Sequence, residues 1–125
     1  MRVAILDDEP AELRRGEQTL RQIPSAADQP WTLHCFERGE DLLRQLRRET
    51  FDLLILDWQL PDLSGLALLR WTREHMEAPP AAIMLTSRDA ESDIVQALNA
   101  GADDYLSKPY SRDQLVVMLR RWLPA

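Results

Sequence analysis

One apolar stretch, Phe51-Asp-Leu-Leu-Ile-Leu-Asp57, is the most informative part of this chain. Its unbroken apolar run, 53–56, ends on a carboxylate and is followed by the turn-forming residues Pro61 and Gly65. A short apolar run without alternation is typical of a strand buried on both faces, as in a parallel sheet covered by helices. In such sheets functional groups gather just beyond the carboxyl ends of the strands. Asp57 is therefore the first candidate functional residue.

Short apolar runs alternate with helix-like segments on both sides of this stretch. Strands are predicted over 2–6, 31–36, 53–56, 81–85 and 104–107, with helices over 10–23, 39–46, from Ser64 to Pro79, 89–100 and 111–122. This alternation predicts an α/β fold, a doubly wound parallel sheet with helices on both faces. Nothing divides the pattern, so we expect one domain over residues 1–125.

The sequence also predicts helix caps, the inward face of one helix, a loop and exposed arginines. Ser64 and Ser111 are predicted to cap the helices that follow them. The helix over 89–100 is predicted to turn Ile94, Val95 and Leu98 inward, because they recur at roughly helical spacing. The segment between Pro24 and Pro30 is predicted to be a loop. The arginine pairs, including Arg14-Arg15, are predicted to lie on solvated helix faces.

The composition excludes several classes of function. A chain of 125 residues that is 45% hydrophobic and 29% charged is ordinary for a globular domain. The net charge of -6 argues against direct nucleic-acid binding, since phosphate contacts need a basic face. Cys35, the single cysteine, is predicted to be a small core residue in a reducing compartment. Neither a signal peptide nor a membrane-spanning segment is recognisable in the sequence.

Polar residues follow four of the predicted strands. Asp7 and Asp8 follow the first, Asp57 the third, Thr86 the fourth and Lys108 the fifth. Three carboxylates brought together repel one another, and one would normally take up a proton. A divalent cation removes that conflict, and oxygen ligands without histidine or cysteine favour Mg²⁺. A carboxylate beside magnesium, a lysine and a hydroxyl suits phosphoryl transfer onto that carboxylate.

The ordered set of motifs resembles the receiver domain of bacterial two-component response regulators over essentially the whole chain. The motifs are Asp7-Asp8-Glu9, Leu56-Asp57, Leu60-Pro61 with Gly65, Leu85-Thr86-Ser87, Gly101-Ala-Asp-Asp-Tyr105 and Lys108-Pro109-Tyr110. The resemblance implies a flavodoxin-like sheet of five parallel strands in the order 2-1-3-4-5 with five helices. It also implies a cytoplasmic signalling protein.

The resemblance assigns roles to the residues at the strand ends. Asp57 would be the phosphoacceptor. Asp8, Asp57 and the backbone carbonyl of Gln59 would bind Mg²⁺ directly, and Asp7 would act mainly through bound water. The side chains of Gln59 and Arg88 would tune the lifetime of the phosphoryl group.

The resemblance also assigns residues that would contact the phosphoryl group or move in response to it. Lys108 would pair with the phosphoryl oxygens, and the peptide before Pro109 would be cis. Thr86 would hydrogen-bond the phosphoryl group, and Tyr105 would turn inward to fill the space that this leaves. The surface altered would be that of the fourth helix, fifth strand and fifth helix.

The implied partner is a sensor histidine kinase, and the implied role is regulatory rather than that of a turnover enzyme. The segment from Gly101 to Ser111 most resembles receivers of the OmpR/PhoB type, which carry a DNA-binding effector domain and dimerise through the surface just described. DNA would then be reached only through an effector domain, and no membrane partner is expected. Asp103 and Asp104 fit the ion-pair pattern of such dimers, whereas Ile94, Gln114 and Met118 do not.

Two other classes of function share parts of this pattern. A haloacid-dehalogenase-like phosphatase also uses magnesium and an aspartate nucleophile, but it needs a second aspartate where this chain has Gln59. A phosphate-independent interaction module could share the fold, although the complete set of site residues argues against it. A P-loop nucleotide enzyme is excluded because the sequence has no glycine-rich phosphate loop.

Overall fold

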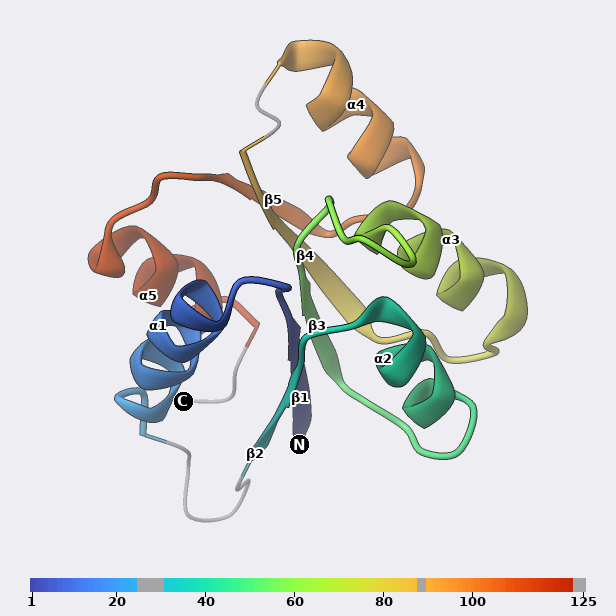
Figure 1. Ribbon diagram of the computed structural model, residues 1–125, viewed down its shortest axis with the longest axis horizontal. Coiled ribbons are helices and arrows are strands. Elements are labelled where there is room, and N and C mark those ends of the chain that lie inside the picture. The colour runs from blue at the N-terminus through green and yellow to red at the C-terminus, as the bar shows by residue number, and fades with distance from the viewer. Residues whose placement is uncertain (25–30, 88–89, 123–125) are drawn as a thin grey trace.

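The computed structural model describes residues 1–24, 31–87 and 90–122. Within these ranges, strands and helices alternate along the chain as the sequence predicts (Figure 1). The strands are β1 (Arg2–Leu6), β2 (Thr32–Phe36), β3 (Leu53–Leu56), β4 (Ala81–Thr86) and β5 (Asp104–Ser107). The helices are α1 (Pro10–Arg21), α2 (Gly39–Leu46), α3 (Gly65–His75), α4 (Glu91–Asn99) and α5 (Arg112–Arg120).

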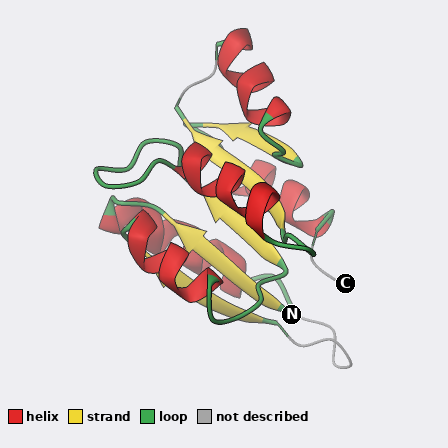
Figure 2. Cartoon of the chain, turned by 90° about the vertical axis from the view of Figure 1, so that its right-hand side faces the viewer, coloured by secondary structure: helices red, strands yellow, loops and turns green. Residues whose placement is uncertain are grey.

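The strands form one parallel sheet in the order β2-β1-β3-β4-β5, which confirms the predicted topology (Figure 2). Helices α1 and α5 cover one face, and α2, α3 and α4 lie on the other (Figure 1). In the register of β1 with β3, Leu6 pairs with Leu56. Asp7 and Asp57 therefore leave neighbouring strands at the same level of the sheet.

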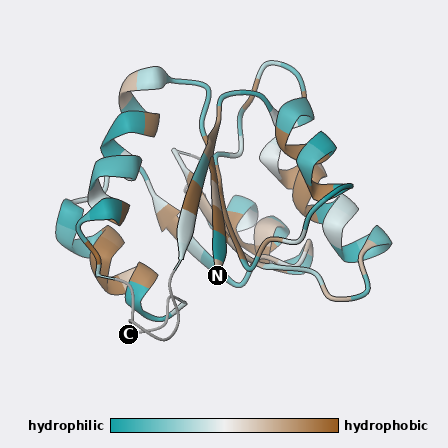
Figure 3. Cartoon of the chain, turned by 90° about the horizontal axis from the view of Figure 1, so that it is seen from below, coloured by the Kyte–Doolittle hydropathy of each residue, from teal (hydrophilic) through white to brown (hydrophobic). Residues whose placement is uncertain are grey.

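Successive residues of the central strands point to opposite faces and feed two separate cores. Val3 and Ile5 pack with the apolar sides of α1 and α5, whereas Ala4 and Leu6 pack with those of α2 and α3. Viewed from below, the apolar residues of the helices turn toward the sheet (Figure 3). Burial of β3 on both faces is the reason that its sequence is apolar without alternation.

The predicted helix caps are confirmed. Ser64 Oγ accepts a hydrogen bond from the backbone N–H of Ala67 at 3.1 Å, and Ser111 Oγ accepts one from Gln114 at 3.1 Å. The Gln114 side chain in turn accepts from the Ser111 backbone N–H, which completes a capping box. The two caps fix the starts of α3 and α5, the helices that follow β3 and β5.

The predicted inward face of α4 is wrong. Val95 and Leu98 are each 48% exposed, Ile94 is half-buried, and the buried residue of this helix is Ala97. A small residue at the contact lets α4 lie close to the sheet, while the larger aliphatic side chains project sideways. Apolar spacing alone could not predict this, because both faces of the helix carry apolar residues.

The prediction that Cys35 is a core residue is also wrong. Strand β2 lies at the edge of the sheet, and Cys35 is exposed there. Its Sγ donates a hydrogen bond to Glu17 Oε2 of α1 at 3.3 Å. Partial desolvation against α1 and the neighbouring Glu17 carboxylate raise the pKa of the thiol to about 12. The thiol is therefore protonated at neutral pH.

Three predictions fall outside the described residues. These are the loop between Pro24 and Pro30, most of which is residues 25–30, the start of the fourth helix at Asp89, and the position of Arg88. Among the helices that the structure does describe, none has both the length and the apolar character that a bilayer crossing requires.

Candidate functional site

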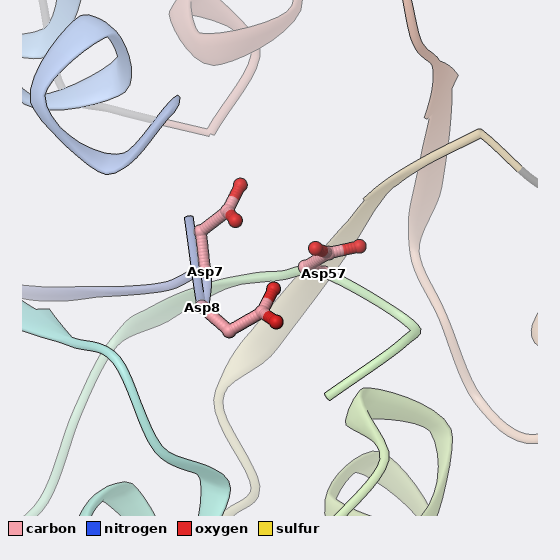
Figure 4. A group of neighbouring side chains, drawn as sticks. All are labelled: Asp7, Asp8 and Asp57. Atoms are coloured by element: carbon pink, nitrogen blue, oxygen red, sulfur yellow. The ribbon is translucent and has the colours of Figure 1, made fainter. Parts of the chain in front are cut away.

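The candidate site lies where β1 and β3 end. The Asp57 backbone N–H donates to the Leu6 carbonyl at 2.9 Å, and this bond holds the two strand ends together. Asp7 and Asp8 project from the end of β1, and Asp57 from the end of β3, into the same space (Figure 4). One carboxylate oxygen from each residue lies within 4.8 Å of those of the other two. The sequence therefore predicted this cluster correctly.

Lys108 reaches the cluster from the end of β5. Its Nζ donates to Asp7 Oδ2 at 2.8 Å and lies 3.6 Å from Asp57 Oδ2. Burial alone would lower the pKa of Lys108, but the hydrogen bond to Asp7 and the charge of Asp57 outweigh it and raise that pKa. Lys108 is therefore a permanent cation, and Asp7 binds it more closely than Asp57 does.

Asp57 is held in an environment that disfavours its charge. Burial is the main cause, and the carboxylates of Asp7 and Asp8 add to it. Lys108 and the Gln59 backbone N–H act in the opposite direction but do not compensate, so the pKa of Asp57 is raised to about 6. A nearby divalent cation would favour the ionised carboxylate.

Thr86 and Tyr105 occupy the next two strands. Thr86 ends β4 and is 1% exposed, and its carbonyl accepts the Lys108 backbone N–H at 2.8 Å. This bond aligns the end of β5 beside Thr86. Tyr105, in β5, is half-buried and packs against the core formed with α2 and α3. The peptide between Lys108 and Pro109 is cis.

A cleft of about 430 Å³ opens beside the carboxylate cluster. Asp8, Asp57, Gln59 and Lys108 line it, whereas Asp7 lies beneath as a buried partner of Lys108. The wall also contains three residues that have no binding role in the sequence-based assignment: Glu12, Arg15 and Tyr110. Arg15, predicted to be simply solvated, is exposed but bonds to Tyr110. That contact joins residues far apart in the sequence, so no local pattern could predict it.

Gly65 fixes the loop that follows Asp57. Its backbone N–H donates to the Trp58 carbonyl at 2.9 Å. A Cβ atom at this position would lie 2.0 Å from the Asp57 carbonyl oxygen, which is impossible without moving the backbone. The site therefore requires glycine here for close approach rather than for a special backbone angle.

Asp62 is a structural carboxylate in the same loop. It accepts hydrogen bonds from the backbone N–H groups of Gly39 at 3.2 Å and Glu40 at 3.0 Å. Partial burial opposes ionisation, but these N–H groups outweigh it and lower the pKa of Asp62. Asp62 thus caps α2 in place of Arg38, whose side chain makes no cap. Sequence reasoning missed it because helix and cap are distant in the chain.

The donor set fits a hard divalent cation. Three carboxylates converge, and a single lysine approaches them. No cysteine lies among them, and oxygen ligands of this kind suit Mg²⁺. Burial first, and the Asp7 and Asp8 carboxylates second, raise the pKa of Asp57, and such an ion would oppose both effects by favouring the ionised carboxylate.

Known proteins share both the sequence and the fold. The profile of the response regulator receiver domain matches residues 3–120. The transcriptional regulatory protein TrcR of Mycobacterium tuberculosis is 36% identical over 120 residues, which are 96% of this chain and 44% of TrcR. The transcriptional regulatory protein KdpE of the same species is 39% identical over 122 residues, 94% of this chain and 49% of KdpE.

A solved structure has the same fold. The BeF3-activated receiver domain of DrrB, from Thermotoga maritima, superposes with a TM-score of 0.82 at 29% identity, covering 97% of this chain and 95% of that one. The chain spans about half the length of the curated relatives named above. The match over residues 3–120 and the identity with these regulators lead to one conclusion: the chain belongs to the receiver-domain family of two-component response regulators.

Proposed function

We propose that residues 1–125 form one phosphoacceptor receiver domain, in which Asp57 accepts a phosphoryl group from a sensor histidine kinase. One observation carries this proposal. The Asp57 carboxylate opens into a cleft, within 4.8 Å of two other carboxylates and 3.6 Å from Lys108 Nζ. A carboxylate beside a fixed cation and a metal-binding cluster is suited to attack phosphorus.

Each side chain has a defined part in this reaction. An Asp57 oxygen attacks, and Lys108, held by Asp7, is close enough to neutralise charge on the arriving phosphoryl oxygens. Asp8, Asp57 and the Gln59 carbonyl would hold Mg²⁺, with Asp7 acting through water. The metal would supply charge neutralisation for the phosphoryl group. The domain would catalyse only its own phosphorylation and slow dephosphorylation.

Phosphorylation would act as a switch through the neighbouring strands. It replaces a carboxylate by a group with about −1.5 to −2 charge and three acceptor oxygens. Thr86 and Lys108 are joined by a backbone hydrogen bond, so a phosphoryl group that attracts both would move the ends of β4 and β5 together. Tyr105, a residue of β5 whose side chain packs against the core, would move inward when Thr86 moves.

The output surface would be the face of α4, β5 and α5. Asp103 and Asp104 are already engaged within the chain, by Arg73 at 3.1 Å and by the Trp122 indole N–H at 3.3 Å. The same face exposes Val95, Leu98 and Val117. A homodimer through this face would therefore be more apolar and less sensitive to salt than an ion-paired one. DNA would be contacted only through an effector domain.

The direct test is phosphorylation followed by intact-protein mass. The purified chain is incubated with acetyl phosphate, with Mg²⁺ or with EDTA, beside Asp57→Asn. We expect a magnesium-dependent gain of one phosphoryl group that is absent from the variant. A folded wild-type chain that gains no phosphoryl group under any condition would instead support the phosphate-independent interaction module.

A further inference from the structure

The cleft contains a second cation that the phosphoacceptor chemistry above does not use. Arg15 of α1 lines the same cleft as Asp57 and Lys108. Its Nη2 donates to the Tyr110 carbonyl at 2.8 Å, and its guanidinium carbon lies 5.2 Å from the centre of the Tyr110 ring. Because Tyr110 is only 5% exposed, it provides a fixed platform for the guanidinium.

The charge of Arg15 is available, unlike that of Lys108. Lys108 is already paired with Asp7 and Asp57. Within residues 1–24, 31–87 and 90–122, no carboxylate lies within ion-pair distance of Arg15. A guanidinium has five N–H donors in a planar fork that matches phosphate oxygens. The hydrogen bond to the Tyr110 carbonyl uses one of them.

We propose that Arg15 is a specificity-determining residue that binds the incoming phosphodonor and favours dianionic donors of the acyl phosphate class. The inference rests on the proposed phosphoacceptor role of Asp57. Glu9 and Glu12 line the same wall, so the Arg15 guanidinium is the group on the α1 side of the cleft that can attract a dianion. A donor that carries a positive charge on its leaving group has a smaller net negative charge, so it gains less from Arg15.

Two small phosphodonors, acetyl phosphate and phosphoramidate, differ in net charge and therefore test whether Arg15 favours dianions. With acetyl phosphate, a lone pair of Asp57 forms the new O–P bond, and the P–O bond to the acyl group breaks with its electron pair leaving on acetate. With phosphoramidate, the P–N bond breaks and ammonia leaves, since its nitrogen is already protonated. The first donor is a dianion near neutral pH. The second is zwitterionic and a net monoanion, because the nitrogen bonded to phosphorus is protonated.

The experiment measures phosphorylation rates of the full chain with each donor in the presence of Mg²⁺. The variants are Arg15→Gln and Arg15→Lys, and the matched control is Arg14→Gln, because Arg14 is exposed on the same helix and does not line the cleft. Thermal unfolding verifies that each variant is folded. We expect Arg15→Gln to lower the rate with acetyl phosphate about fivefold, the effect of one exposed charged contact.

The ratio of the two rates decides the matter. In Arg15→Gln the rate with phosphoramidate should fall clearly less than the rate with acetyl phosphate. Arg15→Lys should recover part of the acetyl phosphate rate, and Arg14→Gln should match wild type. Equal losses with both donors would overturn the proposal, since Arg15 would then only position the loop of Lys108. Unchanged rates would overturn it too. A wild-type chain that accepts phosphate from neither donor would refute the phosphoacceptor role itself.

Discussion

The two ends of the sheet differ in charge balance: charges are paired at one end, and negative charge is in excess at the other. At the amino ends of β4 and β5, Arg73 donates to the Pro80 carbonyl at 2.7 Å, to the Gly101 carbonyl at 2.8 and 3.2 Å, and to Asp103 Oδ2 at 3.1 Å. Asp103 also accepts the Ala82 backbone N–H at 2.8 Å. One cation meets one anion, and the neighbouring backbone groups complete the set.

At the carboxyl ends of the strands, positive and negative charges are not balanced. Three carboxylates face one lysine, and burial raises the pKa of Asp57 to about 6. The comparison shows that a balanced ion pair, with its remaining donors bonded to backbone carbonyls, is by itself evidence only of structure. An excess of one charge at a cleft instead marks a candidate site for a ligand of the other sign. Substitution of Arg73 tests the amino ends of β4 and β5, and substitutions of the aspartates test the carboxyl ends of the strands.

Arg73→Met should produce the largest loss of stability. It leaves the Pro80 and Gly101 carbonyls without their charged donor, whereas the exposed pair with Asp103 adds little, so we expect the free energy of unfolding to fall by about 3 kcal/mol. Chemical denaturation measures this. Arg70→Met, an exposed position on the same helix, is the control and should change little. Magnesium should not alter the Arg73→Met deficit; a deficit that magnesium repairs would contradict the separation of the two ends.

Asp57→Asn should have the opposite sign. The raised pKa of Asp57 means that its ionised form destabilises the folded chain, so removing the charge should stabilise it by about 2 kcal/mol at neutral pH without Mg²⁺. The gain should be absent below pH 3.8, grow as the pH rises from there, and be complete above pH 6. Unfolding at several pH values gives the curve. A gain independent of pH would show that packing rather than charge is responsible.

Magnesium should have a smaller effect that depends on the carboxylate cluster. At several times its dissociation constant, the ion should stabilise the wild-type chain by about 1 kcal/mol. The Asp8→Asn and Asp57→Asn variants should lose most of that gain, because each removes a ligand charge. Thermal unfolding with MgCl2, compared with equal ionic strength of NaCl, is the measurement. Equal stabilisation by both salts would indicate general screening instead of a site.

Asp62→Asn should have the smallest effect, although Asp62 lies only a few residues from Asp57. Its pKa is lowered by the backbone N–H groups at the start of α2, so its charge stabilises the fold at neutral pH by about 0.5 kcal/mol. That contribution should disappear as the pH falls below 3.8, the reverse of the trend for Asp57. Matching pH trends for the two variants would contradict the distinction between a structural and a reactive carboxylate.

The sequence was sufficient for the architecture because each strand has its own local signal. The apolar run 53–56 and the caps Ser64 and Ser111 lie where the pattern placed them, and each strand begins and ends within one residue of its predicted position. The cluster of Asp7, Asp8 and Asp57 followed as well, since neighbouring parallel strands bring their ends together.

The remainder depended on contacts that no local pattern contains. Cys35 is exposed because β2 is an edge strand, which alternation of elements does not reveal. Val95 and Leu98 are exposed because α4 contacts the sheet through Ala97. Arg15 and Asp62 each act on partners distant in the chain, Tyr110 and the start of α2.

The most direct test of the account is the titration of the Asp57 carboxyl carbon by NMR, with and without Mg²⁺. Asp62 in the same spectrum serves as the internal reference, because its pKa should lie below 3.8 in both conditions. We predict an Asp57 pKa of about 6 without the ion and a clear decrease when Mg²⁺ is added. An Asp57 pKa near 3.8 that magnesium leaves unchanged would contradict the claim that unbalanced charge makes this end of the sheet the functional site.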